Sequence, residues 1–180
     1  MITFEEFPKI YRLSREMVIT EKLDGTNASV IIDEEGNFAT ASRTQLITPD
    51  KDNYGFSKWA HEHKDELMTL GPGRHFGEWW GQGIQRKYGL TEKRFSLFNI
   101  RRWEKPENSL PSCVSLVPVL TKGVFDTETI KQTMEDLKLH GSAASPGFMN
   151  PEGVVIFHMQ GNILLKKTFE KDDKGKDYGA

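Results

Sequence analysis

The chain has 180 residues, of which 37% are hydrophobic and 28% charged, and its formal net charge is −2. This length suits one domain with a full hydrophobic core and is short for two. No apolar run approaches the roughly 18 residues of a membrane span, and the N-terminus has no secretory signal. Cys113 is the only cysteine, which excludes an internal disulfide and a thiolate zinc site. We therefore expect a cytoplasmic protein without a membrane partner.

The N-terminal half predicts four strands and one helical segment. Apolar residues on both sides of 22–27 predict two strands, and the second of them is at 28–32. The turn "DEEGN" follows, and a returning strand is predicted at 38–42. From residue 56 the apolar side chains recur with helical spacing, and "GPG" at 71–73 ends that segment. A further strand is predicted at 74–79.

The C-terminal half predicts strands at 95–103, 114–120, 153–158 and 163–169. Asp126 or Thr127 can cap a helix that ends near Gly141. The apolar stripe of that helix is Ile130, Met134 and Leu137. Mixed charges without apolar anchors at 170–180 predict a frayed tail. Strands outnumber helices and many are consecutive, which favours an α+β fold with mainly antiparallel sheet in a single domain, 1–180.

The stretch "VITEKLDGTNASVII" at 18–32 places Lys, Asp and Gly between two strands, although strand interiors disfavour Asp and Gly. A lysine acts as a nucleophile only as a neutral amine, which burial or a nearby cation stabilises. Gly25 would let the backbone turn tightly and approach a ligand, and Asp24 and Asn27 could anchor the turn through their own side chains. The alternative is a solvated Lys22 beside an ordinary Asp-Gly turn, and these residues alone favour that alternative.

Other catalytic systems have little support in the sequence. His61 and His63 lie two residues apart on a predicted helix, and therefore on different faces, which makes a poor metal site. The chain contains neither the glycine-rich phosphate loop of nucleotide hydrolases nor the Gly-x-Ser-x-Gly motif of serine hydrolases. Lys22 is the strongest chemical signal that is left.

Six short segments occur in a fixed order along the chain. They are "EKLDGTN" at 21–27, "ASR" at 41–43, "HFGEWWGQGIQ" at 75–85, "FSLFNI" at 95–100, "PEGVVIFH" at 151–158 and "ILLKKTF" at 163–169. In this order they resemble the motifs of the covalent nucleotidyltransferases, which include ATP-dependent RNA and DNA ligases and mRNA capping enzymes. The first and third segments together are most similar to the RNA ligases of the phage type.

The resemblance implies an antiparallel-rich, ATP-grasp-like nucleotidyltransferase core with the nucleotide bound between sheets. It implies that Lys22 attacks the α-phosphate of ATP and becomes a lysyl-AMP phosphoramidate. Ligases of this kind often carry an OB-fold or helical domain after the last motif, whereas only about eleven residues follow Phe169. We therefore expect no such C-terminal domain.

The resemblance also assigns the binding residues. Arg43 would contact the ribose or a phosphate, and Phe98 would stack on the purine. Glu78 and Glu152 would hold Mg²⁺, for which Mn²⁺ can substitute, directly or through water. The implied nucleotide-binding set is Glu21, Lys22, Asn27, Arg43, Glu78, Phe98, Glu152 and Lys166. The alternatives are a surface role for Arg43, core packing for Phe98 and simple exposure for the two carboxylates.

The adjacent lysines of "ILLKKTF" depart from the commoner family pattern of two lysines one residue apart. Side chains of adjacent strand residues point to opposite faces of a sheet, so only one of the two can face the nucleotide. Lys166 is favoured because Thr168 would share its face. Lys167 is expected in solvent.

Between Gln82 and Lys105 seven basic residues outnumber two acidic ones, and aromatic residues are interleaved with them. Such a mixture can follow phosphates and stack on bases, although charge alone favours a solvated loop beside a buried strand. Within this segment we assign RNA binding to Arg86 and Lys87.

The expected protein is thus an ATP-dependent RNA ligase. AMP would pass from Lys22 to a 5′-phosphate end, and a 3′-hydroxyl would displace it, either at free RNA ends or in a nicked duplex. A DNA ligase or a capping-type guanylyltransferase is the alternative enzyme, and a non-catalytic nucleotide- or RNA-binding module is the alternative of another class. The nucleophile and both carboxylates argue against the last. A phage-encoded chain would act in the host-cell cytoplasm.

Overall fold

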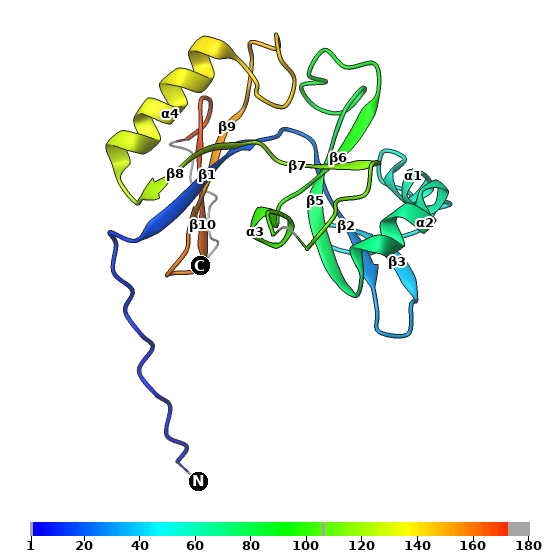
Figure 1. Ribbon diagram of the computed structural model, residues 1–180, viewed down its shortest axis with the longest axis horizontal. Helices are drawn as coiled ribbons and strands as arrows, with labels where there is room; N and C mark the ends of the chain where they lie inside the picture. The colour runs from blue at the N-terminus through cyan, green and yellow to red at the C-terminus, as the bar shows by residue number, and fades with distance from the viewer. Residues whose placement is uncertain (1, 106, 173–180) are drawn as a thin grey trace.

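The computed structural model describes residues 2–105 and 107–172 and arranges them around two β-sheets that lie side by side (Figure 1). The strand order is β10-β9-β1-β8 in the four-stranded sheet and β4-β3-β2-β5-β6-β7 in the six-stranded sheet. Every pair of neighbouring strands is antiparallel except β6 and β7. The predicted α+β class with mainly antiparallel pairing is therefore confirmed.

The four-stranded sheet is covered on one face by a single helix. Its strands are β1 (Glu16–Lys22), β8 (Val119–Val124), β9 (Gly153–His158) and β10 (Ile163–Thr168), and the helix is α4 (Thr127–His140). The Asp126 carboxylate caps this helix by accepting hydrogen bonds from the amides of Glu128 and Thr129. The predicted stripe is buried against the sheet, and it consists of Ile130, Met134 and Leu137.

The six-stranded sheet contains the larger, aromatic core. Its strands are β2 (Thr26–Ile32), β3 (Phe38–Ser42), β4 (Leu46–Ile47), β5 (Gly73–Gly81), β6 (Lys93–Leu97) and β7 (Val114–Leu116). The helices α1 (Phe56–Glu62), α2 (Lys64–Leu67) and η1 (Met68–Leu70) pack on one face. The predicted helical segment is therefore interrupted at His63, and it ends at Gly71, whose φ is 73°.

Two predicted strands are wrong in extent. The strand predicted at 95–103 ends at Leu97, because the Asn99 side chain accepts a hydrogen bond from the Arg102 amide and caps a short helix, α3 (Ile100–Trp103). The strand predicted at 114–120 is broken at residues 117 and 118, where the chain passes from β7 of one sheet to β8 of the other. Pro118 has no amide hydrogen to donate, which suits a break between two strands.

A third cluster of buried residues lies between the sheets and contains Leu23, Trp80, Tyr88, Ile100 and Val117. Gly25, in the connection from β1 to β2, passes very close to β5. A Cβ at Gly25 would lie 2.4 Å from the carbonyl oxygen of Trp79. The glycine therefore permits two backbone segments of the protein to approach each other closely. The sequence had predicted a close approach to a ligand at this residue.

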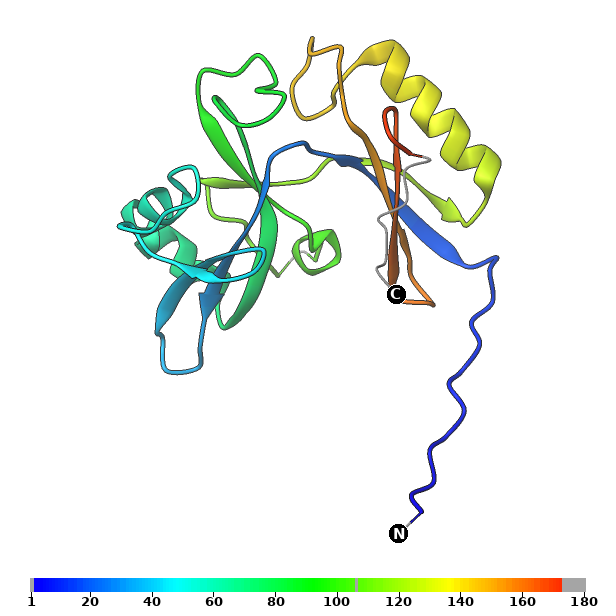
Figure 2. The same cartoon turned by 180° about the vertical axis from the view of Figure 1, so that it is seen from behind.

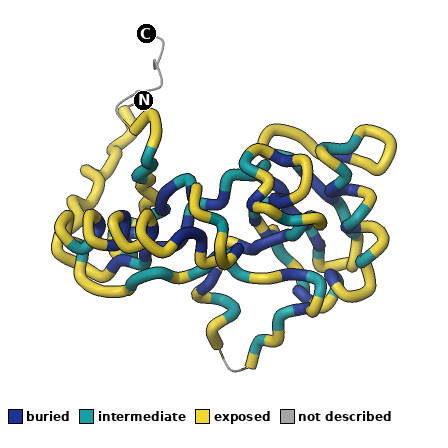
Figure 3. The backbone as a smooth tube through the Cα atoms, turned by 90° about the horizontal axis from the view of Figure 1, so that it is seen from above, coloured by how far each residue is buried: buried dark blue, intermediate teal, exposed yellow. Residues whose placement is uncertain are grey.

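The N-terminal segment extends away from both sheets, as the view from behind in Figure 2 also shows. The buried stretches follow the strands of both sheets, whereas residues 2–14 are exposed (Figure 3). Among the described residues, no helix is long and apolar enough to cross a membrane. Most of the tail predicted to fray, residues 173–180, lies outside the described residues.

Candidate active site

Lys22 is the last residue of β1, and the sheet register decides which way it faces. In β1, Lys22 pairs with Gly153 of β9, and Thr20, two residues earlier on the same face, pairs with Val155. Val155 pairs on its other side with Lys166 of β10. Because paired residues of antiparallel strands share a face, Lys22 and Lys166 both lie on the face opposite α4. We call this the open face. Lys167 pairs with Val154 on the α4 side, so the predicted preference for Lys166 agrees with the register.

The amine of Lys22 forms an ion pair with Glu152, which directly precedes β9. The distance from Lys22 Nζ to Glu152 Oε2 is 2.6 Å, and the two side chains are 24% and 19% exposed. The sequence suggested burial or a cation beside this lysine, whereas the structure places a carboxylate there. The amine has to give up a proton and leave this carboxylate before it can attack another atom.

Glu78 faces the same region from β5. Its Oε1 accepts a hydrogen bond of 3.1 Å from the Gly25 amide. Burial raises the pKa of Glu78 to about 7; the charge of Lys22 and the Gly25 amide oppose that rise, and the charges of Glu152 and Asp24 add to it. The site therefore gathers carboxylates that repel one another, in an environment that a bound cation would stabilise.

A divalent cation fits these donors in one specific form. In the described part of the chain, no three or more His, Cys, Asp or Glu side chains form a ready-made metal cluster. Mg²⁺ is commonly held by only one or two carboxylates together with water and substrate phosphates. The predicted pair, Glu78 and Glu152, suits that mode of binding.

Other predicted residues lie on the six-stranded sheet. Asn27 pairs with Glu78, so both side chains lie on one face of that sheet. Arg43 is exposed directly after β3. Phe98 directly follows β6, its amide donates to the carbonyl oxygen of Phe76 at 3.0 Å, and its side chain is 40% exposed. Phe98 is thus not a core residue, and it is free to contact a ligand.

Glu21 is not brought to the open face. It alternates with Lys22 along β1, is only 1% exposed, and accepts hydrogen bonds from the amides of Ala143 and Ala144 at 2.8 and 3.0 Å. Burial raises the pKa of this carboxyl. Its place on the α4 side follows from strand alternation, so the predicted contact of the Glu21 side chain with the nucleotide has no support from the register.

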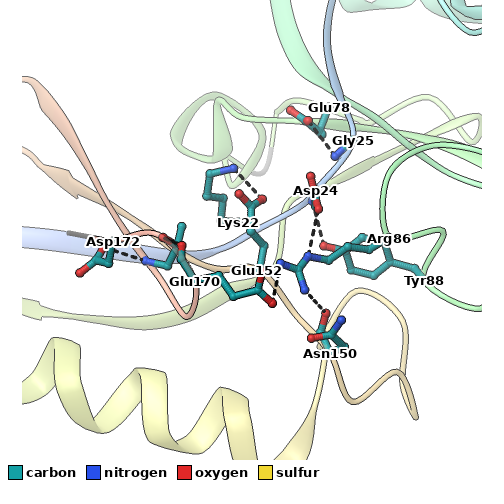
Figure 4. Close-up of polar contacts among 11 residues, drawn as sticks. Lys22, Asp24, Gly25, Glu78, Arg86, Tyr88, Asn150, Glu152, Glu170 and Asp172 are labelled. Atoms are coloured by element: carbon teal, nitrogen blue, oxygen red, sulfur yellow. Dashed lines mark hydrogen bonds and ion pairs between the residues drawn. The ribbon is translucent and has the colours of Figure 1, made fainter. Parts of the chain in front are cut away.

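Arg86 also differs from its prediction. Its side chain is 15% exposed, and its guanidinium group contacts Asp24, Asn150 and Glu170 (Figure 4), so it is less available to RNA than an exposed cation would be. Lys87 is exposed, and its role in RNA binding stays a prediction. Sequence reasoning missed the link from Arg86 to Asp24, for which the only signal was the basic "RKYG" at 86–89, directly after the third motif.

A cavity of about 530 Å³ opens beside β6 and β7. Its lining includes Trp80, Arg94, Ser96 and Ser115 and none of the residues predicted to bind nucleotide. The Trp80 indole donates to Ser96 Oγ, which in turn bonds to Ser115 Oγ. The indole of Trp80 and the hydroxyls of Ser96 and Ser115 thus satisfy one another. Because this cavity contains none of the predicted residues, the region around Lys22 is the candidate active site.

The fold is α+β with two antiparallel-rich sheets, and side chains from both sheets lie around Lys22. The model of the RNA ligase family matches residues 15–170, and the chain belongs to this family.

Several solved structures of Naegleria gruberi RNA ligase have the same fold. A glutamate-to-alanine mutant with AMP and Mn superposes with a TM-score of 0.66 at 20% identity over 87% of this chain and 50% of that one. A second such mutant, with ATP and Mn, gives 0.64 at 18% identity over 92% and 53%. A lysine-to-alanine mutant with ATP and Mn gives 0.63 at 20% identity over 86% and 49%. The chain thus spans about half the length of these proteins.

Proposed function

We propose that this chain is the adenylyltransferase part of an ATP-dependent RNA ligase of the phage type, with Lys22 as its nucleophile and residues 1–180 acting as one unit. The observation that carries the proposal is the position of Lys22. It is the last residue of β1, on the open face, and its Nζ lies 2.6 Å from Glu152 Oε2. Its positive charge also opposes the rise in the pKa of Glu78. Membership of the RNA ligase family supports RNA ends as the substrate.

In the first step, Lys22 Nζ attacks the α-phosphorus of ATP. A nitrogen–phosphorus bond forms, the bond to the bridging oxygen breaks, and pyrophosphate leaves. The amine must lose a proton in this step, and Glu152 is the carboxylate within reach of it. A divalent cation held by Glu78 and Glu152 would supply positive charge that offsets the charge of the departing pyrophosphate.

In the second step, an oxygen of an RNA 5′-phosphate attacks the same phosphorus. The nitrogen–phosphorus bond breaks, Lys22 regains its amine, and RNA with a 5′–5′ linked AMP results. In the third step, a 3′-hydroxyl attacks the 5′-phosphorus of the RNA. A phosphodiester forms, AMP leaves, and the strand is sealed.

The nucleotide would lie between the open face of the four-stranded sheet and the face of the six-stranded sheet that carries Asn27 and Glu78. Phe98 would stack on the adenine, because it is the half-exposed aromatic at the end of β6. Arg43 offers a guanidinium to the ribose or a phosphate. Lys166, on the same face as Lys22, would stabilise the charge that develops on the α-phosphate.

Self-labelling with ATP tests the proposal directly. Incubation with α-labelled ATP and Mg²⁺ should leave label on the denatured wild-type protein, stable to alkali and lost in acid, as a phosphoramidate requires. Lys22→Ala should take no label, and Lys22→Arg should also fail because a guanidinium stays protonated. Persistent labelling of Lys22→Ala would remove Lys22 as the nucleophile.

The same assay separates the competing functions. Label from GTP in preference to ATP would indicate a capping-type guanylyltransferase. Transfer of AMP to 5′-phosphorylated DNA in preference to RNA would indicate a DNA ligase. A wild-type protein that binds ATP and takes no label would indicate a binding module.

A further inference from the structure

Arg86 lies in the loop between β5 and β6, and its guanidinium group contacts three segments that are far apart in the sequence (Figure 4). Its Nε donates to Asp24 Oδ2 at 2.9 Å, and its Nη1 donates to the carbonyl oxygen of Asn150 at 3.3 Å. Its Nη2 lies 3.7 Å from Glu170 Oε1. Only 15% of the side chain is exposed. The guanidinium group is therefore engaged within the protein.

These contacts lie beside the Lys22–Glu152 ion pair. Asp24 follows Lys22 by two residues, and Asn150 precedes Glu152 by two. Arg86 therefore ties together the same two segments that the 2.6 Å ion pair joins. A shift of either segment would change the separation between the amine and the carboxylate.

Tyr88, from the same loop, holds the same turn in a second way. Its hydroxyl oxygen accepts a hydrogen bond of 2.8 Å from the Asp24 amide. Its ring is only 1% exposed and packs against Trp80 and Phe148. Asp24 is thus fixed through its side chain by Arg86 and through its backbone by Tyr88.

The backbone of this loop adopts an unfavourable conformation to present these two side chains. Gln85, Lys87 and Tyr88 have φ values of 41°, 60° and 51°. The left-handed region is disfavoured for residues other than glycine. Such conformations persist where surrounding contacts hold them, and they cluster at functional sites. Gln85 and Lys87 are exposed, whereas Ile84 is buried in the core and Arg86 and Tyr88 contact the Asp24 turn, so these three side chains hold the loop.

We propose that Arg86 is a positioning residue for Lys22, and that it fixes Asp24 and Asn150 so that the amine and Glu152 stay opposed. The proposal rests on the proposed function for the reaction that Lys22 performs. Without the guanidinium, Asp24, whose side chain is 27% exposed, loses its cation, and the turn after Lys22 is left to the backbone contacts with Tyr88 and Glu78. The attack on ATP should therefore suffer more than ATP binding or RNA binding.

A kinetic comparison tests the proposal. The variants are Arg86→Gln, Asp24→Asn and the double variant, with Arg74→Gln, an exposed arginine of β5, as the matched control. Arg86→Gln should lower the maximal rate of self-adenylation about ten- to a hundredfold. The ATP concentration at half the maximal rate and the salt dependence of RNA binding should stay near the wild-type values. The double variant should lose about as much as Arg86→Gln alone, because the interaction that Asp24→Asn removes is one that Arg86→Gln removes already.

A second measurement requires neither ATP nor activity. Acetic anhydride modifies free amines, and mass spectrometry reads the modification of each lysine. An amine held against a carboxylate is protected, so Arg86→Gln should raise the acetylation of Lys22 several-fold relative to exposed Lys58. If Arg86→Gln does not fold by circular dichroism, Arg86→Lys keeps a cation near Asp24 and loses the hydrogen bond to Asn150, and it should raise the acetylation of Lys22 in the same direction by a smaller factor.

The outcomes separate the two proposals. Wild-type protein that takes no label removes the proposed function, and the acetylation of Lys22 still decides the role of Arg86. Labelled wild-type protein with equal rates and equal Lys22 acetylation in Arg86→Gln would overturn the positioning role alone. Normal self-adenylation with weakened transfer to RNA would overturn it too, and would return Arg86 to RNA contact.

Discussion

The two sheets hold their parts of the candidate site in different ways. In the six-stranded sheet, Asn27 and Glu78 are neighbours on paired strands above a large aromatic core. In the four-stranded sheet the core is smaller and largely aliphatic, and Lys22 and Glu152 meet at strand ends through an ion pair. Backbone pairing orients the side chains in both halves, and in the four-stranded sheet an ion pair between charged side chains also holds them together.

The largest effect is expected from the carboxylates, one on each side of this comparison. Glu78→Gln and Glu152→Gln should each slow self-adenylation about tens to hundreds of fold, as the loss of one electrostatic stabiliser does. Both variants should stay folded, because glutamine has the size of glutamate and its side-chain oxygen at residue 78 can still accept the hydrogen bond from the Gly25 amide. Label uptake across a series of Mg²⁺ concentrations measures the first effect. Exposed Glu135→Gln on α4 is the control, and a wild-type rate for Glu152→Gln would disprove its assignment.

The turn that joins the two halves should be the most sensitive part of the backbone. Gly25→Ala places a methyl group 2.4 Å from the Trp79 carbonyl oxygen and 2.7 Å from Trp80 Cβ. Both neighbours belong to a strand with little freedom to move, so the variant should lose about 1–3 kcal/mol of stability. Gly123→Ala is the control, because nothing lies within 4 Å of its added methyl group. Urea unfolding measures both, and equal stability of the two variants would contradict the close approach at Gly25.

The sequence predicts local structure well and convergence of distant segments poorly. Helix α4 is predicted correctly because its cap and its stripe of Ile130, Met134 and Leu137 lie within one stretch. The strand predicted at 95–103 is wrong because a side-chain cap at Asn99 overrides an apolar pattern that also suits a strand. Only the motif order predicted that Lys22 and Glu152 belong to one site, because 130 residues separate them, and their ion pair was not predicted. The contacts of Arg86 join residues 24, 150 and 170, and no local pattern indicates them.

The two adjacent lysines of β10 provide a matched pair. Lys166 shares the open face with Lys22, whereas Lys167 lies on the other face and bonds to Asp172 at 2.9 Å. Lys166→Ala should lower the rate of self-adenylation about tenfold, because it removes one positive charge near the α-phosphate. Lys167→Ala should stay within about twofold of wild type, since an exposed ion pair contributes little. Label uptake at saturating ATP measures both, and the reverse order would place the nucleotide on the α4 side.

The smallest effect concerns His75, a buried residue of β5 in the six-stranded sheet. It is 4% exposed, and its Nε2 bonds to the Gly71 carbonyl oxygen at 2.8 Å. Burial lowers the pKa of His75, the nearby Arg102 charge lowers it further, and the Gly71 carbonyl partly opposes both. The folded state thus binds fewer protons than the unfolded state, where the pKa of a histidine is about 6.5.

This part of the stability is fully present above about pH 6.5 and is lost as the pH falls through the lower pKa of the folded state. His75→Gln cannot take up that proton, and its amide can still donate to Gly71. Its free energy of unfolding should therefore fall less than that of the wild type between about pH 7.5 and pH 5. Urea unfolding at several pH values measures the difference. If the free energies of unfolding of the two proteins change in parallel with pH, then His75 is not held neutral in the folded state and does not contribute to the pH dependence of stability.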